Sequence, residues 1–177
     1  MAVIVYYVAA SLDGFIGTLE GGVDWLASAD AREDHGYAQF YATVDAVLVG
    51  GRTYDAVLAH GEWPFPGKAC VVLTKRERPM RAEAEFTDRE PVEVARDLER
   101  RGVKRAWLLG GGELAGAFRN AGLIDEYIVS HVPVILGDGI PIFGFSSGRE
   151  TLEHVGSRTF SDGVVQSHYL RNAKSRT

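Results

Sequence analysis

The chain has 177 residues, of which 46% are hydrophobic and 24% are charged, and its formal net charge is −5. This length and apolar content are typical of one globular domain and exclude a disordered chain, so we expect a single domain over residues 1–177. The negative charge argues against a general nucleic-acid binder. No run approaches the roughly 18 consecutive apolar residues of a membrane span, so neither nucleic acid nor membrane is an expected partner.

The N-terminus and the cysteine content limit the location and the chemistry. Met1–Val5 leads directly into an apolar run without the features of a secretory signal, which predicts a cytoplasmic protein. Cys70 is the only cysteine, which excludes an intrachain disulfide and any multi-cysteine zinc site, including that of a zinc deaminase. The five histidines show no metal-ligand spacing, so we expect no metal site.

The first predicted elements are a buried strand and a helix. The apolar run Val3–Ala9 predicts the strand. Ser28 is a candidate N-cap, and Asp30 and Glu33 would then lie in the first helical turns. We therefore expect a helix from Ser28 to about Thr43.

Short apolar runs then alternate with helical patterns, which is typical of a parallel sheet with crossover helices. The predicted strands are Ala46–Val49, Ala69–Leu73 and Arg105–Leu109. The predicted helices are Thr53–Ala59, Pro91–Arg101 and Glu113–Asn120.

The pattern changes in the last third of the chain. Glu126–Leu136 is predicted as one long extended segment, and Leu152–Phe160 and Val164–Leu170 flank a hairpin turn at Ser161–Gly163. We therefore predict an α/β fold of three layers. Its central sheet would be mainly parallel, with an antiparallel C-terminal edge hairpin and helices on both faces.

The strongest chemical motif is the glycine run Gly110–Gly112, where a predicted strand enters a helix. Such a junction presents backbone N–H groups at the positive end of a helix, which suits a phosphate. With Ala115 the run also fits a dinucleotide-binding fingerprint, although a tight turn without a ligand is the alternative. The motif lies too late in the chain for a Rossmann fold, so we exclude that fold and retain the dinucleotide.

Three glycine-bearing junctions in this order resemble the dihydrofolate reductase superfamily. They are Ser11–Gly17 (SLDGFIG), Gly51–Tyr54 (GRTY) and Gly110–Gly112 (GGG). The resemblance covers about residues 3–170 and is greatest to the reductase domain of the bifunctional riboflavin-biosynthesis deaminase-reductase and its stand-alone relatives. It implies a dihydrofolate reductase-like fold and an NADPH molecule across the carboxyl ends of the parallel strands.

The resemblance also implies which residues bind the cofactor. These are Ala9, Ile16, Gly17, Gly51, Arg52, Thr53, Leu73, Thr74, Lys75, Arg76, Gly110, Gly111, Gly112, Glu113 and Leu114. Among them, Arg52, Lys75 and Arg76 would converge on the 2′-phosphate. A cis peptide bond between Gly110 and Gly111 is also implied.

On the substrate side, the resemblance implies Trp25, Asp30 and Ser130. The spacing from Trp25 to Asp30 matches that of the dihydrofolate reductase acid, so Asp30 is the predicted catalytic residue. In the alternative interpretation, Asp30 only favours the start of a helix. Neighbouring side chains that could serve instead are Asp24, Asp34, His35 and Tyr37.

The implied activity is an NADPH-dependent hydride transfer to a C=O or C=N bond of a small pyrimidine- or pterin-like heterocycle. The first candidate is a riboflavin-pathway 5-amino-6-(5-phosphoribosylamino)uracil reductase. The alternatives are a dihydrofolate reductase and a non-catalytic NADPH-binding module. A phosphorylated substrate needs basic side chains, and residues 1–74 contain only Arg32, Arg52 and Lys68. Homodimers are common in the superfamily, and the apolar segment Ile124–Leu136 is a candidate dimer interface. In the alternative interpretation, this segment belongs to the hydrophobic core.

Overall fold

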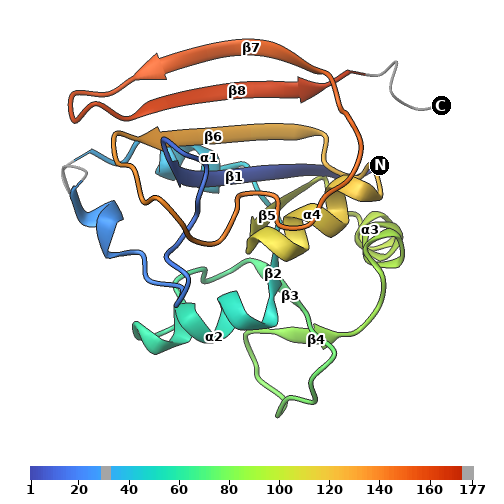
Figure 1. The fold of residues 1–177 in the computed structure, drawn as a ribbon. Coiled ribbons are helices and arrows are strands. Elements are labelled where there is room, and N and C mark those ends of the chain that lie inside the picture. Colours follow the sequence, from blue (N-terminus) through green and yellow to red (C-terminus); the bar gives the residue numbers. More distant parts are fainter. Residues whose placement is uncertain (29–32, 173–177) are drawn as a thin grey trace.

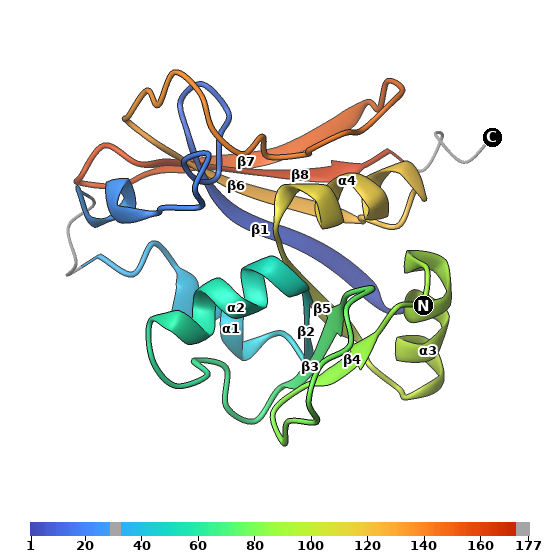
Figure 2. The same ribbon diagram turned by 60° about the horizontal axis from the view of Figure 1, so that its bottom comes forward.

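The structure is a computed structural model that describes residues 1–28 and 33–172. Within that part, one sheet has the strand order β4-β3-β2-β5-β1-β6-β8-β7, with β4 and the β7–β8 hairpin at opposite ends (Figures 1 and 2). The strands are β1 (Val3–Ser11), β2 (Ala46–Gly50), β3 (Ala69–Leu73), β4 (Glu85–Thr87), β5 (Arg105–Gly110), β6 (Glu126–Val132), β7 (Leu152–Thr159) and β8 (Val165–Arg171). The helices are the 3-10 helix η1 (Asp24–Ser28) and the α-helices α1 (Tyr37–Ala42), α2 (Gly51–Ala59), α3 (Pro91–Arg100) and α4 (Gly112–Asn120).

The strand directions confirm the predicted fold class. Strands β4, β3, β2, β5, β1 and β6 are mutually parallel, whereas β8 pairs antiparallel with β6 and β7 antiparallel with β8. On one face, Ile4 and Tyr6 of β1 pack in a cluster with Phe118 of α4. On the other face, Val5 packs with Phe40 of α1. Side chains alternate along a strand, so a continuous apolar strand such as β1 requires a cover on both faces.

The prediction of a long helix from Ser28 to Thr43 gives the wrong first residue. Ser28 is the last residue of η1, and α1 begins only at Tyr37. The reason is local: His35 and Gly36 have positive φ angles of 51° and 78°, which an α-helix does not allow. Asp34 is the actual start signal, because its carboxylate accepts hydrogen bonds from the N–H groups of Gly36 and Ala38.

Two further differences concern strands. The segment predicted as extended from Glu126 to Leu136 leaves the sheet after Val132, and the loop that follows returns to pair Pro141 with Phe15. Pro133 has no N–H group with which to continue a ladder. Strand β4 was not predicted, because its three residues lie in a charged segment without a periodic apolar pattern.

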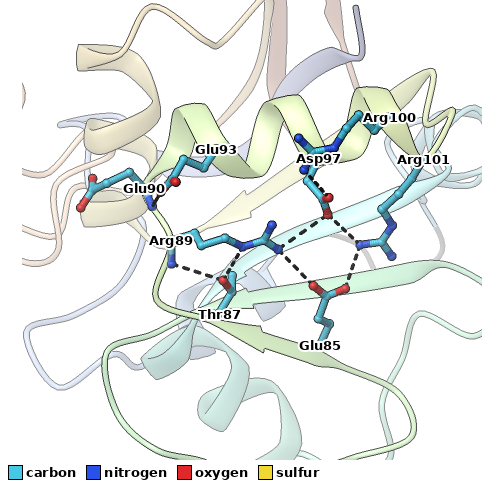
Figure 3. Close-up of polar contacts among 8 residues, drawn as sticks. All are labelled: Glu85, Thr87, Arg89, Glu90, Glu93, Asp97, Arg100 and Arg101. Atoms are coloured by element: carbon cyan, nitrogen blue, oxygen red, sulfur yellow. Dashed lines mark hydrogen bonds and ion pairs between the residues drawn. The ribbon is translucent and has the colours of Figure 1, made fainter.

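A network of ion pairs connects β4 to α3 (Figure 3). Arg89 bridges Glu85 of β4 and Asp97 of α3 at 3.2 and 3.6 Å. Arg101 reaches the same two carboxylates at 2.8 and 3.4 Å, and Arg100 lies 2.9 Å from Asp97. Together these arginines lower the pKa of Asp97, with the hydrogen bond from Arg100 as the largest cause. The short edge strand is thus held mainly by its neighbour β3 and by charged contacts.

Among residues 1–28 and 33–172, no helix is long and apolar enough to cross a membrane. Nor do they contain a group of three or more His, Cys, Asp or Glu side chains that could hold a metal ion.

Candidate functional site

The candidate site is built where two strand–helix junctions lie side by side. Strand β2 enters α2 at Gly50, and β5 enters α4 at Gly111. A Cβ added to Gly50 would lie 3.6 Å from the carbonyl oxygen of Gly110 and 3.9 Å from the nitrogen of Gly111. Because β2 and β5 are adjacent and parallel, both helices start at the same edge of the sheet. This edge is where open α/β sheets bind ligands.

Four other predicted cofactor residues, Ile16, Gly51, Thr53 and Thr74, come to this edge. A Cβ on Gly111 would lie 3.0 Å from Oγ1 of Thr53 and 3.9 Å from Cδ1 of Ile16. A Cβ on Gly51 would lie 2.9 Å from Oγ1 of Thr74, at the end of β3. Residues that follow β1, β2, β3 and β5 therefore meet here, although they are up to about a hundred positions apart in the sequence.

The start of each helix is suited to a phosphate. The N-cap positions of α2 and α4 are the glycines Gly50 and Gly111, which have no side chain to cap the first turn. The first-turn N–H groups of both helices thus point toward the shared edge with the positive ends of their dipoles. The Gly110–Gly111 peptide bond is cis, as the resemblance implied. A dinucleotide with two linked phosphates fits this arrangement. Because the glycines have no side chains, the phosphates can approach the backbone N–H groups closely.

Close packing of the backbone requires glycine at two positions near this edge, Gly112, which is one of the predicted cofactor residues, and Gly139, which is not. A Cβ on Gly112 would lie 2.1 Å from the carbonyl oxygen of Pro141, so Gly112 is required for the close packing of α4 against that loop. A Cβ on Gly139 would lie 2.3 Å from the carbonyl oxygen of Gly17, which also accepts a hydrogen bond from Ile140 at 2.9 Å. The loop around residues 139–142 thereby covers the Ile16–Gly17 segment.

Arg52 lies in the first turn of α2, which follows β2, and Lys75 and Arg76 follow the neighbouring strand β3. Arg52 forms an ion pair with Glu113 of α4, at 2.5 Å, which raises the pKa of the Arg52 guanidinium. Lys75 and Arg76 follow β3, which lies on the other side of β2 from β5.

Arg78 is a residue at this edge that the sequence analysis missed. Its guanidinium is 16% exposed and pairs with both carboxylate oxygens of Asp55, which lowers the pKa of Asp55. It also donates to the carbonyl oxygen of Gly51 at 3.5 Å. The available signal was the basic run directly after a buried strand, which continues two residues beyond Arg76.

The predicted substrate residues lie at the neighbouring strand end. Ala9 of β1 pairs in register with Ser130 of β6, and Trp25 packs in the same apolar cluster as Ala9. Trp25 and Ser130 are both buried. Asp30, the predicted acid, lies in residues 29–32, outside the described residues.

The sequence analysis also did not predict a polar network next to Ser130. Gln166 of β8 donates through Nε2 to Oγ of Ser130 at 2.9 Å and to the carbonyl oxygen of His35 at 3.2 Å. The same carbonyl oxygen accepts from the hydroxyl of Tyr7 at 3.4 Å, and Nε2 of His35 lies 2.7 Å from Asp162. Only the tertiary structure reveals this network, because its members come from four separate segments. Of these residues, the sequence indicated only His35, as an alternative to the acid Asp30, and it predicted no role for Tyr7, Gln166 or Asp162.

The fold and this edge define the class of protein: an α/β reductase-like domain with a dihydrofolate reductase-like fold. The chain belongs to the RibD C-terminal domain family, whose sequence model matches residues 2–166. This result confirms the family that the glycine-bearing junctions indicated.

Individual relatives agree with this assignment. The chain is 35% identical to an uncharacterized protein of Bacillus subtilis, YwjB, over 169 residues that cover 94% of this chain and 97% of that protein. It is 34% identical to the riboflavin biosynthesis protein RibD of Mycobacterium tuberculosis over 149 residues, which are 76% of this chain and 43% of that longer protein. A solved structure of a putative riboflavin biosynthesis protein from Shewanella superimposes with a TM-score of 0.88 at 29% identity, over 97% of this chain and 99% of that one.

Proposed function

We propose that this protein is an NADPH-dependent reductase that transfers a hydride to a C=O or C=N bond of a small pyrimidine- or pterin-like heterocycle. The observation that carries the proposal is the meeting of Ile16, Gly51, Thr53, Thr74 and Gly111 at one edge of the sheet. Membership of the RibD C-terminal domain family supports a reductase. In this proposal the substrate resembles that of the riboflavin-pathway 5-amino-6-(5-phosphoribosylamino)uracil reductase.

The residues of the chain have distinct tasks in this proposal. The bound nicotinamide would supply the hydride. The first-turn N–H groups of α2 and α4 would hold the two linked phosphates, and Lys75 and Arg76 would lie beside the 2′-phosphate. Ile16 and Gly17, held down by the hydrogen bond from Ile140, would cover the reacting ring and exclude water.

The substrate would lie on the neighbouring strands. Ser130 would contribute a hydroxyl beside Ala9, and Trp25 would form an apolar wall in the same cluster. A proton must accompany the hydride, and we propose Asp30 as its donor, directly or through a water molecule.

The test is an NADPH-oxidation screen with purified protein. 5-Amino-6-(5-phosphoribosylamino)uracil and dihydrofolate are supplied in separate reactions, and the loss of NADPH absorbance is followed. Turnover of the first substrate supports the riboflavin-type reductase, and turnover of dihydrofolate alone supports the dihydrofolate reductase alternative. NADPH binding without oxidation by either compound would favour the non-catalytic module and contradict the proposal.

The role of Asp30 is tested separately with Asp30→Asn. We expect turnover to fall about 100- to 10,000-fold while NADPH affinity stays unchanged, because the amide keeps the size but not the acid. Single-turnover rates are measured across pH with the substrate found in the screen. Near-normal turnover of the variant at every pH would place the acid elsewhere.

A further inference from the structure

Part of the first glycine-bearing junction is attached to a distant loop beside the candidate site. Residues 14–17 follow β1, and we call them the cover segment because Ile16 and Gly17 would lie over the nicotinamide. Their neighbour is the supporting segment, residues 134–142, in the connection from β6 to β7. Cδ1 of Ile16 lies 3.9 Å from the position that a Cβ on Gly111 would take, so the cover segment borders the cofactor edge.

Backbone hydrogen bonds join the two segments in the manner of a short antiparallel ladder. The N–H of Ile16 donates to the carbonyl oxygen of Ile140 at 2.8 Å, and the N–H of Ile140 donates to the carbonyl oxygen of Gly17 at 2.9 Å. The N–H of Ile142 donates to the carbonyl oxygen of Gly14 at 3.0 Å. The cover segment is therefore bonded to its neighbour at both of its ends.

The supporting segment is itself anchored to the core. The hydroxyl of Tyr6, a fully buried side chain of β1, donates to the carbonyl oxygen of Ile142 at 2.6 Å. A Cβ on Gly112 would lie 2.1 Å from the carbonyl oxygen of Pro141, so the backbone of α4 packs directly against this segment. The cover segment can move away only if its bonds to this fixed neighbour break.

Asp13, which directly precedes the cover segment, adds a charged connection to the supporting segment. Its Oδ1 accepts a hydrogen bond from the N–H of Leu136 at 3.1 Å, and its Oδ2 accepts one from the N–H of Gly137 at 2.8 Å. Successive N–H groups of a turn bind an anion well, and Gly137 has a positive φ of 81°. The two donors are 123 and 124 positions from Asp13 in the sequence, so only the folded chain makes this contact.

Ser11 extends the contact of Asp13 into the cover segment. Its Oγ donates to Oδ1 of Asp13 at 2.7 Å and accepts a hydrogen bond from the N–H of Phe15 at 3.0 Å. Ser11 is fully buried, and its own N–H donates to the carbonyl oxygen of Phe15 at 2.8 Å. The hydrogen bond from Ser11 is the largest cause that lowers the pKa of Asp13, so Asp13 is an ionised acceptor at neutral pH.

We propose that Asp13 is a positioning residue that holds the cover segment over the nicotinamide site before the cofactor binds. This inference rests on the proposed function. Asp13 acts through Ser11 and the supporting segment and not by contact with the reacting atoms. A cover that is already ordered excludes water from the reacting ring, and no loop has to be ordered at the moment of binding.

The first measurement is hydrogen exchange of single backbone amides in the protein without cofactor. The proteins are wild type, Asp13→Ala, Asp13→Asn and the control Asp138→Asn, which removes an exposed carboxylate from the supporting segment. We expect exchange at Ile16 and Ile140 to be slow in wild type and about 5- to 20-fold faster in Asp13→Ala, because charge-assisted hydrogen bonds are lost. Asp13→Asn should lie between the two, since the amide keeps one acceptor oxygen, and the control should match wild type.

An amide far from the two segments distinguishes a local effect from a general loss of stability. Leu108 of β5 is fully buried, and its exchange should be the same in Asp13→Ala as in wild type.

The second measurement tests whether the cover segment lies on the nicotinamide. The fluorescence of NADPH arises from its reduced nicotinamide ring, and the neutral quencher acrylamide acts on the ring where solvent reaches it. At saturating NADPH, we expect the cofactor bound to wild type to be quenched less than free NADPH. Quenching in Asp13→Ala should rise toward the value of free NADPH, and Asp138→Asn should behave as wild type.

Three results with Asp13→Ala would overturn the inference: unchanged exchange at Ile16 and Ile140, an equal rise at Leu108, or faster local exchange without more quenching of bound NADPH. If NADPH binds to wild type and one of these results is found, only the role of Asp13 fails. If NADPH does not bind to wild type, the reductase proposal fails and the inference fails with it.

Discussion

At the scale of single residues, two adjacent glycines of one motif have separable roles. Gly111 has a φ of −73°, which any residue can adopt, and an added Cβ would meet a side-chain atom, Oγ1 of Thr53 at 3.0 Å, which can rotate aside. At Gly112 the neighbour is a backbone atom, because an added Cβ would lie 2.1 Å from the carbonyl oxygen of Pro141. A sequence motif of three glycines does not distinguish a glycine required by a ligand from one required by packing.

This difference is testable with two valine variants. We expect Gly111→Val to fold with a near-normal melting temperature and to bind NADPH roughly 100-fold more weakly, because the branched side chain fills the space at the helix starts. Gly112→Val should instead lower the melting temperature by many degrees or prevent folding, because backbone atoms cannot move aside. Circular dichroism and calorimetric titration measure the two effects. Unchanged NADPH affinity in Gly111→Val would contradict the assignment of this glycine to the cofactor.

At the scale of elements, the strands and helices with strong patterns were predicted, and the contact-dependent ones were not. Strand β3 was predicted with its observed bounds, because a run of buried apolar residues forms a strand wherever it is covered on both faces. The start of α1 was missed, since Ser28 and Asp34 are equally good capping types and only the chain path at His35 and Gly36 selects Asp34. Strand β4 exists because β3 pairs with it and charged contacts hold it to α3.

The attachment of β4 to α3 should therefore depend on salt and pH. Asp97→Asn should lower the melting temperature by about 1–3 °C at low ionic strength, and this difference should vanish in 1 M salt, because the charges are exposed and screened. The folded-state pKa of Asp97 is below its ordinary value, so its stabilisation is complete above about pH 4 and is lost as pH falls through the folded pKa.

Thermal melts of the Asp97→Asn variant and of wild type, across salt and pH, check this expectation. Glu153→Gln, which removes an exposed carboxylate on β7, serves as a matched control with no expected change. A loss that persists in 1 M salt would show that Asp97 acts by packing rather than by charge.

At the scale of the whole molecule, cofactor binding and folding are linked, because the binding edge joins segments from residues 16 to 111. A ligand at 100 times its dissociation constant stabilises the folded state by about 2.7 kcal/mol. For a domain of this size, this corresponds to a rise of several degrees in melting temperature, about 5 °C or more. NADPH should therefore raise the melting temperature at concentrations where NADH has little effect.

The physical reason is the 2′-phosphate, which only NADPH carries and which Lys75 and Arg76 would pair with. We expect a preference for NADPH of about 10- to 100-fold after allowance for solvent screening. The double variant Lys75→Ala and Arg76→Ala should shrink this preference while NADH binding persists. Equal shifts from both cofactors in the wild-type protein would contradict the assignment of the 2′-phosphate.

The sequence alone determined the fold class, the family and the three glycine-bearing junctions, because apolar runs and glycine turns are local features that act wherever they occur. Only the tertiary structure decided which of those residues face one another: Gly111 with Thr53 and Ile16, and Arg52 with Glu113. The pairing of Ala9 with Ser130 likewise became visible only through strand register. Register and side-chain pairing depend on contacts between distant segments, and a single sequence contains no local signal for them.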